Sequence, residues 1–183
     1  MICFKIAYIL TPITFGGAER VSLNFLNTVD RSRFEIKPIL LVRPWEDVPY
    51  FAREVSRLGY CYETIPVALR PCGKDFFRLL RVVYQISSLM KKESFDLVHT
   101  QGYFADICGL LVARMHGIPT ISTCHGYISN DRKLKIYNKV DTYALRLCET
   151  VIAVSENIQK ELISSGINPS RISVIPNAVP RLL

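Results

Sequence analysis

Short apolar runs rich in β-branched residues alternate along this chain with longer runs of helical periodicity, and this alternation constrains its fold most. Several of the apolar runs have no polar face, which is typical of strands buried on both sides of a parallel sheet. The sequence therefore predicts an α/β fold with helices on both faces of a mostly parallel sheet of about seven strands. The expected strands are Phe4–Leu10, Glu35–Val42, Cys61–Pro66, Asp96–Thr100, Thr120–Thr123, Thr150–Val154 and Ile172–Ile175.

Helices are expected between these strands, and the last of them has clear ends. Ser155 is a favourable N-cap for it, and Gly166 supplies a residue suited to the left-handed stop. After the final strand, the segment "PNAVPRLL" is typical of a linker that leaves a domain. The expected helices are Ala18–Val29, Val48–Leu58, Lys74–Glu93, Phe104–His116, Leu134–Cys148 and Glu156–Ser165.

The composition suits one folded domain. The chain has 183 residues, of which 49% are hydrophobic, and no apolar run reaches the roughly 18 residues that span a bilayer. Its first residues resemble a strand more than a signal peptide, so a cytoplasmic location is expected. The six cysteines are scattered, with no C-x-x-C pair and no histidine at ligand spacing, so neither a disulfide nor a metal site is expected.

The net charge of +7 favours an anionic partner. Nucleic acid, a membrane surface and phosphorylated small molecules all fit this charge. No arginine-rich block and no base-stacking signature occurs, so nucleic acid is not the expected partner.

A glycine pair follows the first expected strand. Gly16 and Gly17 lie where that strand passes into a helix, at the sheet edge where open α/β folds bind ligands. Free N–H groups and the helix dipole favour an anion at such a position, and Arg20 in the first turn could contribute. The spacings G-x-G-x-x-G and G-x-x-x-x-G-K-[ST] are both absent. A tight turn and an anion site are equally consistent with this local pattern.

Two histidines stand near the ends of later strands. His99 belongs to "FDLVHTQ", and His125 with Gly126 follows the strand "TISTC". Either histidine alone could be a structural, hydrogen-bonded residue. Because the carboxyl ends of parallel strands share one edge, both are expected to lie with the glycine pair in one cleft.

A basic segment, "NDRKLKIYNKV", begins the fifth expected helix. Leu134, Tyr137, Val140, Ala144 and Leu147 recur at helical spacing and are expected to face the core. The cations on the other side are a solvated face by default, or a surface that meets anionic lipid or an anionic acceptor. They are Lys133, Lys135, Lys139 and Arg146.

Five motifs occur in a fixed order: "GGAER", "FDLVHTQ", "STCHG", "VIAVSE" and "VIPNAV". In this order they resemble the N-terminal domain of family 4 (group 1) retaining glycosyltransferases, which have the GT-B fold. The resemblance covers nearly the whole chain and implies a Rossmann-like, acceptor-side domain at residues 1–175. Residues 176–183 would begin the interdomain linker, and the C-terminal donor domain of that fold is absent from this sequence.

The resemblance implies the transfer of a sugar, with retention, from a nucleotide-sugar donor to a saccharide or lipid acceptor. His125 matches the family histidine that approaches the donor sugar, so it is the expected catalytic residue. Gly16, Gly17, Arg20, His99 and Gly126 are the expected donor- or acceptor-binding residues. No cofactor and no metal are implied, and the chain without its second domain is expected to be inactive.

Two other functions remain open at this level. Sugar-nucleotide epimerases also use the GT-B architecture, so the chain could be half of such an enzyme. A non-catalytic acceptor-binding or membrane-surface module is a second alternative, because the positive charge suits an anionic membrane.

Overall fold

The computed structural model describes residues 3–12, 16–42, 50–67, 75–126 and 132–177. Within these ranges seven strands form one sheet in the order β3-β2-β1-β4-β5-β6-β7, and every neighbouring pair is parallel. The predicted α/β class and parallel sheet are therefore confirmed. The strands are β1 Phe4–Leu10, β2 Phe34–Val42, β3 Glu63–Pro66, β4 Leu97–Gln101, β5 Thr120–Cys124, β6 Thr150–Ala153 and β7 Ile172–Val174.

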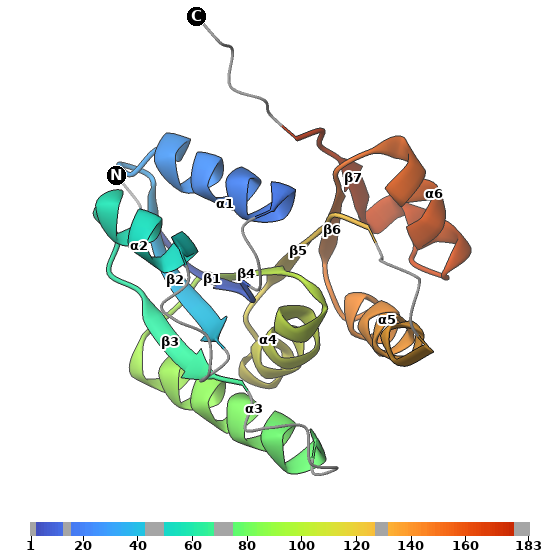
Figure 1. Ribbon diagram of the computed structural model, residues 1–183, viewed down its shortest axis with the longest axis horizontal. Helices are drawn as coiled ribbons and strands as arrows, with labels where there is room; N and C mark the ends of the chain where they lie inside the picture. The colour runs from blue at the N-terminus through green and yellow to red at the C-terminus, as the bar shows by residue number, and fades with distance from the viewer. Residues whose placement is uncertain (1–2, 13–15, 43–49, 68–74, 127–131, 178–183) are drawn as a thin grey trace, which may run out of the picture.

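Helices cover the sheet on both faces (Figure 1). On one face α1 and α2 pack over the half that contains β1, β2 and β3. On the other face α3 and α4 pack over the centre, and α4, α5 and α6 over β6 and β7. The helices are α1 Gly17–Thr28, α2 Tyr50–Arg57, α3 Asp75–Lys92, α4 Tyr103–His116, α5 Arg132–Leu145 and α6 Glu156–Ser164.

Strand β1 shows why these apolar runs form central strands. Ala7 and Ile9 pack with the α3–α4 layer, whereas Ile6, Tyr8 and Leu10 pack with the α1–α2 layer. Successive side chains point to opposite faces, so apolar residues are favoured at both kinds of position in a strand that is covered on both sides.

Most helix signals in the sequence hold. Ser155 caps α6, because its Oγ accepts a hydrogen bond from the N–H of Ile158 at 3.3 Å. A short 3-10 turn, Pro169–Arg171, was not predicted; Asn168 caps it through a 3.0 Å bond from the N–H of Ser170. The observed ends of helices and strands differ from the predicted ends by up to three residues. Helix α5, for example, ends at Leu145, whereas the sequence predicted an end at Cys148.

The predicted core stripe of α5 is wrong at Val140. Val140 is 44% exposed, and Asp141 and Leu145 are buried in its place. The cause is a buried polar cluster that takes the side chain of Asp141 into the interior. A pattern that treats aspartate as an outward-facing residue cannot anticipate this rotation.

Helix α4 lies very close to the sheet at Gly109. A Cβ built on Gly109 would lie 2.8 Å from Thr100 Cγ2 on β4 and 3.0 Å from Ile9 Cδ1 on β1. Side chains in both strands would have to move to accept it. Glycine is therefore needed here for the approach of two elements, despite its poor helix propensity.

Replacing Gly109 with valine is expected to lower the free energy of unfolding by roughly 1–3 kcal/mol, because it overpacks this contact. Chemical denaturation of the purified chain measures the change. Leu111→Val is the matched control, since it places the same side chain on the exposed side of α4. Equal stability of the two variants would show that the sheet accommodates a side chain at position 109.

Candidate functional site

The connection order reverses between β1 and β4. From β1 the chain moves outward through β2 to β3, and it then crosses to β4 and continues in the other direction. In open parallel sheets the crevice at such a point, beyond the carboxyl ends of the strands, is where ligands bind. The predicted site residues that follow β1 and β5 lie at this carboxyl edge.

The glycine pair forms the start of α1. Gly16 is the N-cap residue and Gly17 the first helical residue; Glu19 Oε2 accepts a 3.0 Å hydrogen bond from the N–H of Gly16. That N–H is therefore engaged within the chain. The N–H of Gly17 is one of the first helical donors without an acceptor in its own helix, and Gly17 is exposed. Arg20, also exposed, lies one turn further on.

His125 lies just beyond β5 and within electrostatic range of Glu19, so it is near the start of α1. Its Nε2 is buried and has no hydrogen-bond partner among the described residues. Burial lowers the pKa of His125, and the nearby Glu19 carboxylate opposes that shift. The imidazole is thus neutral at neutral pH, a state suited to hydrogen-bonding a hydroxyl group.

Gly126 turns the chain away from the sheet directly after His125. Its φ of +100° is a conformation that L side chains rarely adopt. A Cβ at this position would also contact Ile158 Cδ1 of α6 at 3.5 Å. The local backbone alone therefore accounts for a glycine after the histidine.

Thr11 is a site candidate that the sequence analysis missed. It directly follows β1, and its Oγ1 is buried without a hydrogen-bond partner among the described residues. Buried hydroxyl and imidazole groups without partners are uncommon in folded proteins. Thr11 and His125 place one such atom each at the same edge of the sheet, which favours a polar ligand there.

Gln101, the last residue of β4, attaches the start of α1 to the sheet. Its Oε1 lies 2.6 Å from Tyr8 Oη and 2.8 Å from Ser22 Oγ, and its Nε2 donates to the carbonyl of Ala18 at 3.1 Å. This network is buried. It fixes the first turn of α1, and with it Gly17, relative to β4.

His99 lies deeper in the same face of β4. Its ring packs against Tyr8 and Phe25, with centroids 4.9 and 5.9 Å away, and its Nε2 lies 2.8 Å from Thr123 Oγ1. Burial lowers the pKa of His99 to about 4, so the ring is neutral. These contacts give His99 a packing role, and its contact with a ligand stays a prediction.

A second polar cluster lies under the opposite face of the sheet. Asp106 on α4 accepts hydrogen bonds from the hydroxyl groups of Thr100 and Ser122, the latter at 2.6 Å. Its carboxyl group also hydrogen-bonds that of Asp141 on α5. Two buried carboxyl groups in contact favour a shared proton, and burial raises the pKa of Asp106 to about 6. The cluster ties α4 and α5 to β4 and β5.

This raised pKa predicts how stability depends on pH. The ordinary pKa of aspartate is 3.8, so the folded chain holds the proton more tightly than the unfolded chain. The contribution of the protonated Asp106 to the free energy of unfolding is complete below about pH 4, and it is lost as the pH rises through about 6. Asp106→Asn is expected to remove this loss, which is on the order of 1–3 kcal/mol.

Denaturation curves at pH 4 and pH 7 measure the effect. Glu161→Gln, an exposed change on α6, is the matched control and is expected to keep the wild-type pH profile. An Asp106→Asn variant with that same profile would contradict the shared proton.

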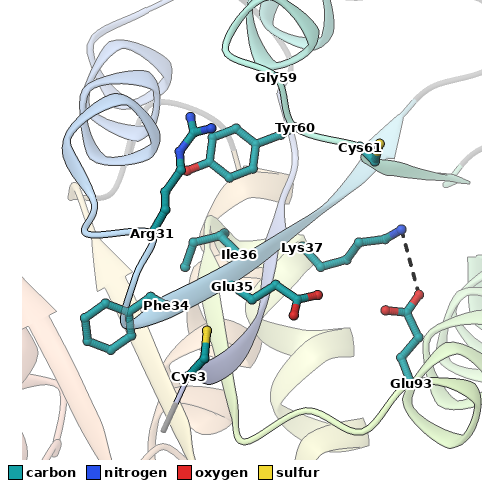
Figure 2. Close-up of a pocket in the computed structure, with 10 residues that line it drawn as sticks. All are labelled: Cys3, Arg31, Phe34, Glu35, Ile36, Lys37, Gly59, Tyr60, Cys61 and Glu93. Carbon is teal, nitrogen blue, oxygen red and sulfur yellow. Dashed lines mark ion pairs between the residues drawn. The ribbon is translucent and has the colours of Figure 1, made fainter. Parts of the chain in front are cut away.

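A hollow of about 460 Å³ opens at the other, amino edge of the sheet (Figure 2). Its wall holds an ion pair of 3.8 Å between Lys37 and Glu93, and Arg31 lies over the ring of Tyr60. Figure 2 shows these side chains directed at one another. Their mutual pairing and their distance along the strands from the switch point favour a structural role.

Known proteins match the chain along most of its length. A model of Glycosyltransferase Family 4 matches residues 15–181. The chain belongs to this family. One curated relative of this family 4 chain is the Escherichia coli UDP-Gal:alpha-D-GlcNAc-diphosphoundecaprenol alpha-1,3-galactosyltransferase. The two sequences are 26% identical over 182 residues, and the match covers 96% of this chain and 45% of the relative.

Solved structures show the fold of the family 4 chain. The lipopolysaccharide outer core galactosyltransferase WaaB in its apo form matches with a TM-score of 0.74 at 22% identity, over 96% of this chain and 46% of that one. The UDP-GlcNAc 2-epimerase of Methanocaldococcus jannaschii matches with a TM-score of 0.68 at 18% identity, over 95% and 46%. The Rossmann-like half of a GT-B fold, as the sequence predicted, is confirmed.

The family 4 chain spans about half the length of the relatives it matches. Among its described helices, none is long and apolar enough to cross a membrane.

Proposed function

We propose that this chain is the acceptor-side half of a retaining glycosyltransferase, which moves a sugar from a nucleotide-sugar donor to a lipid-linked acceptor. The observation that carries the proposal is the carboxyl edge at the switch point. There the exposed Gly17 begins α1, and the buried Nε2 of His125, which has no hydrogen-bond partner among the described residues, lies within electrostatic range of Glu19 in the first turn of the same helix.

The chemistry of these two groups suits the two parts of a nucleotide-sugar. A helix N-terminus favours the negative diphosphate, because its first N–H groups have no acceptor and the helix dipole is positive there. A neutral imidazole suits a sugar hydroxyl, which can donate or accept a hydrogen bond. His125 would thus orient the sugar while the start of α1 faces the charge that develops on the leaving group.

A lipid-linked acceptor is supported by the name of the Escherichia coli relative, which gives its acceptor as alpha-D-GlcNAc-diphosphoundecaprenol. Such an acceptor carries both a diphosphate and a saccharide, and both suit the polar groups of this edge. The proposal includes retention, no cofactor besides the nucleotide-sugar, and residues 176–183 as the start of a linker to a donor-binding domain. We also propose that the 183-residue chain does not catalyse sugar transfer by itself.

The test is a transfer assay on a longer protein that continues past residue 183. It would be incubated with UDP-galactose or UDP-N-acetylglucosamine and an undecaprenyl-diphosphate saccharide, and the product would be identified by mass spectrometry and its anomeric configuration by NMR. The proposal predicts one added sugar, a hexose or an N-acetylhexosamine according to the donor, with the anomeric configuration of the donor. Inversion would contradict retention, and equal turnover by the 183-residue chain would contradict its inactivity.

A sugar-nucleotide epimerase is the second candidate, because an epimerase shares the fold at a TM-score of 0.68. The same assay without acceptor separates the two. Formation of an epimeric nucleotide-sugar would assign the chain to that class and would overturn transfer as its function.

A further inference from the structure

The outer surface of α3 and α4 is unusually apolar for a face that points to solvent. On α3, Phe77, Leu80 and Tyr84 are 68%, 48% and 74% exposed, and on α4 Leu111 and Met115 are 42% and 65% exposed. These five residues are here called the α3–α4 face. Helices of a soluble domain usually bury one apolar stripe and present polar side chains outward.

Helix α3 has a second, inner stripe that accounts for its packing on the sheet. Val82, Ile86 and Met90 are buried in the core, on the side opposite Leu80 and Tyr84. The inner stripe therefore accounts for the packing of α3 on the sheet without the exposed parts of the outer apolar residues. The two helices pack side by side, as the 2.8 Å contact between Ser87 Oγ and His116 Nε2 shows, so their outer residues form one surface.

The exposed charged side chains that the structure describes on α3 and α4 have one sign. Arg81, Lys91 and Lys92 on α3 and Arg114 on α4 are exposed, whereas Asp106, the acidic residue of α4, is buried. No exposed carboxylate occurs among the described side chains of these two helices. On the other layer, by contrast, cations and carboxylates are mixed, and Arg57 pairs with Glu54 at 2.6 Å.

We propose that the α3–α4 face docks the protein on an anionic lipid bilayer. Exposed aromatic and aliphatic groups flanked by lysine and arginine are what a helix needs in order to lie in the interface, with its apolar side chains among the acyl chains and its cations at anionic headgroups. The proposed docking is peripheral, with α3 and α4 lying on the surface of the bilayer.

The α3–α4 face extends along the length of both helices. Helix α3 follows β3, so it begins at the carboxyl edge and runs back toward the amino edge (Figure 1). Phe77 and Leu80, in its first two turns, therefore lie toward the edge that carries Gly17 and His125. Leu111 and Met115 lie in the later turns of α4, toward the amino edge, so the face extends along both helices and the docked protein would lie with these helices along the bilayer surface. The docking itself does not depend on the transfer chemistry, because none of the face's residues belongs to the candidate site.

Sedimentation with vesicles tests the proposal directly. The 183-residue chain would be mixed at low salt with vesicles of phosphatidylcholine alone, and with vesicles that also contain phosphatidylglycerol. Binding is expected only with the anionic lipid, and it is expected to fall as salt shortens the Debye length from about 30 Å at 0.01 M to about 10 Å at 0.1 M.

Matched double variants then locate the surface. Arg81→Gln with Lys91→Gln is expected to weaken partitioning about 30-fold, since each cation near an anionic surface contributes about fivefold. Arg53→Gln with Lys160→Gln removes the same charge from exposed positions on α2 and α6, and it is expected to leave partitioning within about threefold of wild type.

A second pair of variants tests the apolar part of the face. Leu80→Ser with Tyr84→Ser is expected to weaken partitioning about tenfold or more, through lost burial of apolar area. Ile163→Ser, at an exposed apolar position on α6, is expected to have little effect. Circular dichroism confirms that each variant is folded.

Three results would overturn the proposal. The first is no binding to anionic vesicles at low salt. The second is an equal loss in the control variants, which would make net charge the cause. The third is a concentration-dependent dimer in analytical ultracentrifugation that Leu80→Ser abolishes, which would assign the face to a second copy of the chain.

Discussion

Replacing Gly17 with valine in the longer enzyme is expected to lower kcat/KM for sugar transfer by about 100-fold or more, at nearly unchanged stability. A Cβ at Gly17 would meet nothing within 4 Å, and the backbone there is not in the left-handed region. A valine side chain would therefore occupy only the space in front of the helix N-terminus. In the proposed function, that space holds the diphosphate.

The control keeps the same substitution on the same helix. Asn27 is exposed near the other end of α1, so Asn27→Val measures the cost of a β-branched residue in this helix, which is less than about 1 kcal/mol. Melting temperatures of both variants would accompany the kinetics. Wild-type kcat/KM in Gly17→Val would show that no ligand approaches this backbone and that the glycine pair is only a turn.

Replacing His125 with alanine in the longer enzyme is expected to reduce kcat by about 100-fold, because in the proposed function this histidine hydrogen-bonds the reacting sugar. His125→Gln keeps an N–H donor and is expected to recover part of the loss. Burial lowers the pKa of His125 below its usual 6.5, so the imidazole stays mostly neutral between pH 8 and pH 6.5. Protonation of His125 is therefore not expected to lower the wild-type rate in this range. The comparison is made by steady-state kinetics over this pH range.

His116 provides the matched histidine. It ends α4 near the amino edge, and its Nε2 contacts Ser87 rather than the carboxyl edge. His116→Ala is expected to keep nearly the wild-type kcat. A His125→Ala enzyme that turns over as fast as His116→Ala would remove His125 from the chemistry.

The sheet could be predicted because its strands are buried on both faces. Apart from Lys5 near its start, the run Phe4–Leu10 is hydrophobic, and the helices between the strands are long enough for right-handed crossovers. The shared carboxyl edge follows from parallel strands, so the neighbourhood of Gly17 and His125 could be inferred before the structure was known.

Side-chain partners could not be predicted in this way. His99 and Gln101 lie on the same face of β4, yet Gln101 reaches Ala18 on α1, whereas His99 is enclosed by Tyr8 and Phe25. The only sequence signal for Gln101 was its place directly after the expected strand Asp96–Thr100. Asp141 gave no signal at all, because its burial depends on Asp106, a residue distant in the sequence.

Ligand mapping by NMR tests the central claim most directly. The longer protein, with isotope-labelled glycine and histidine, would be titrated with a UDP-sugar and a water-soluble diphosphate saccharide. The account predicts that the largest shifts occur at Gly16, Gly17, His125 and Gly126, with little change at Gly59, which lines the hollow at the amino edge. Shifts centred on Gly59, with Gly17 and His125 unchanged under saturating ligand, would contradict it.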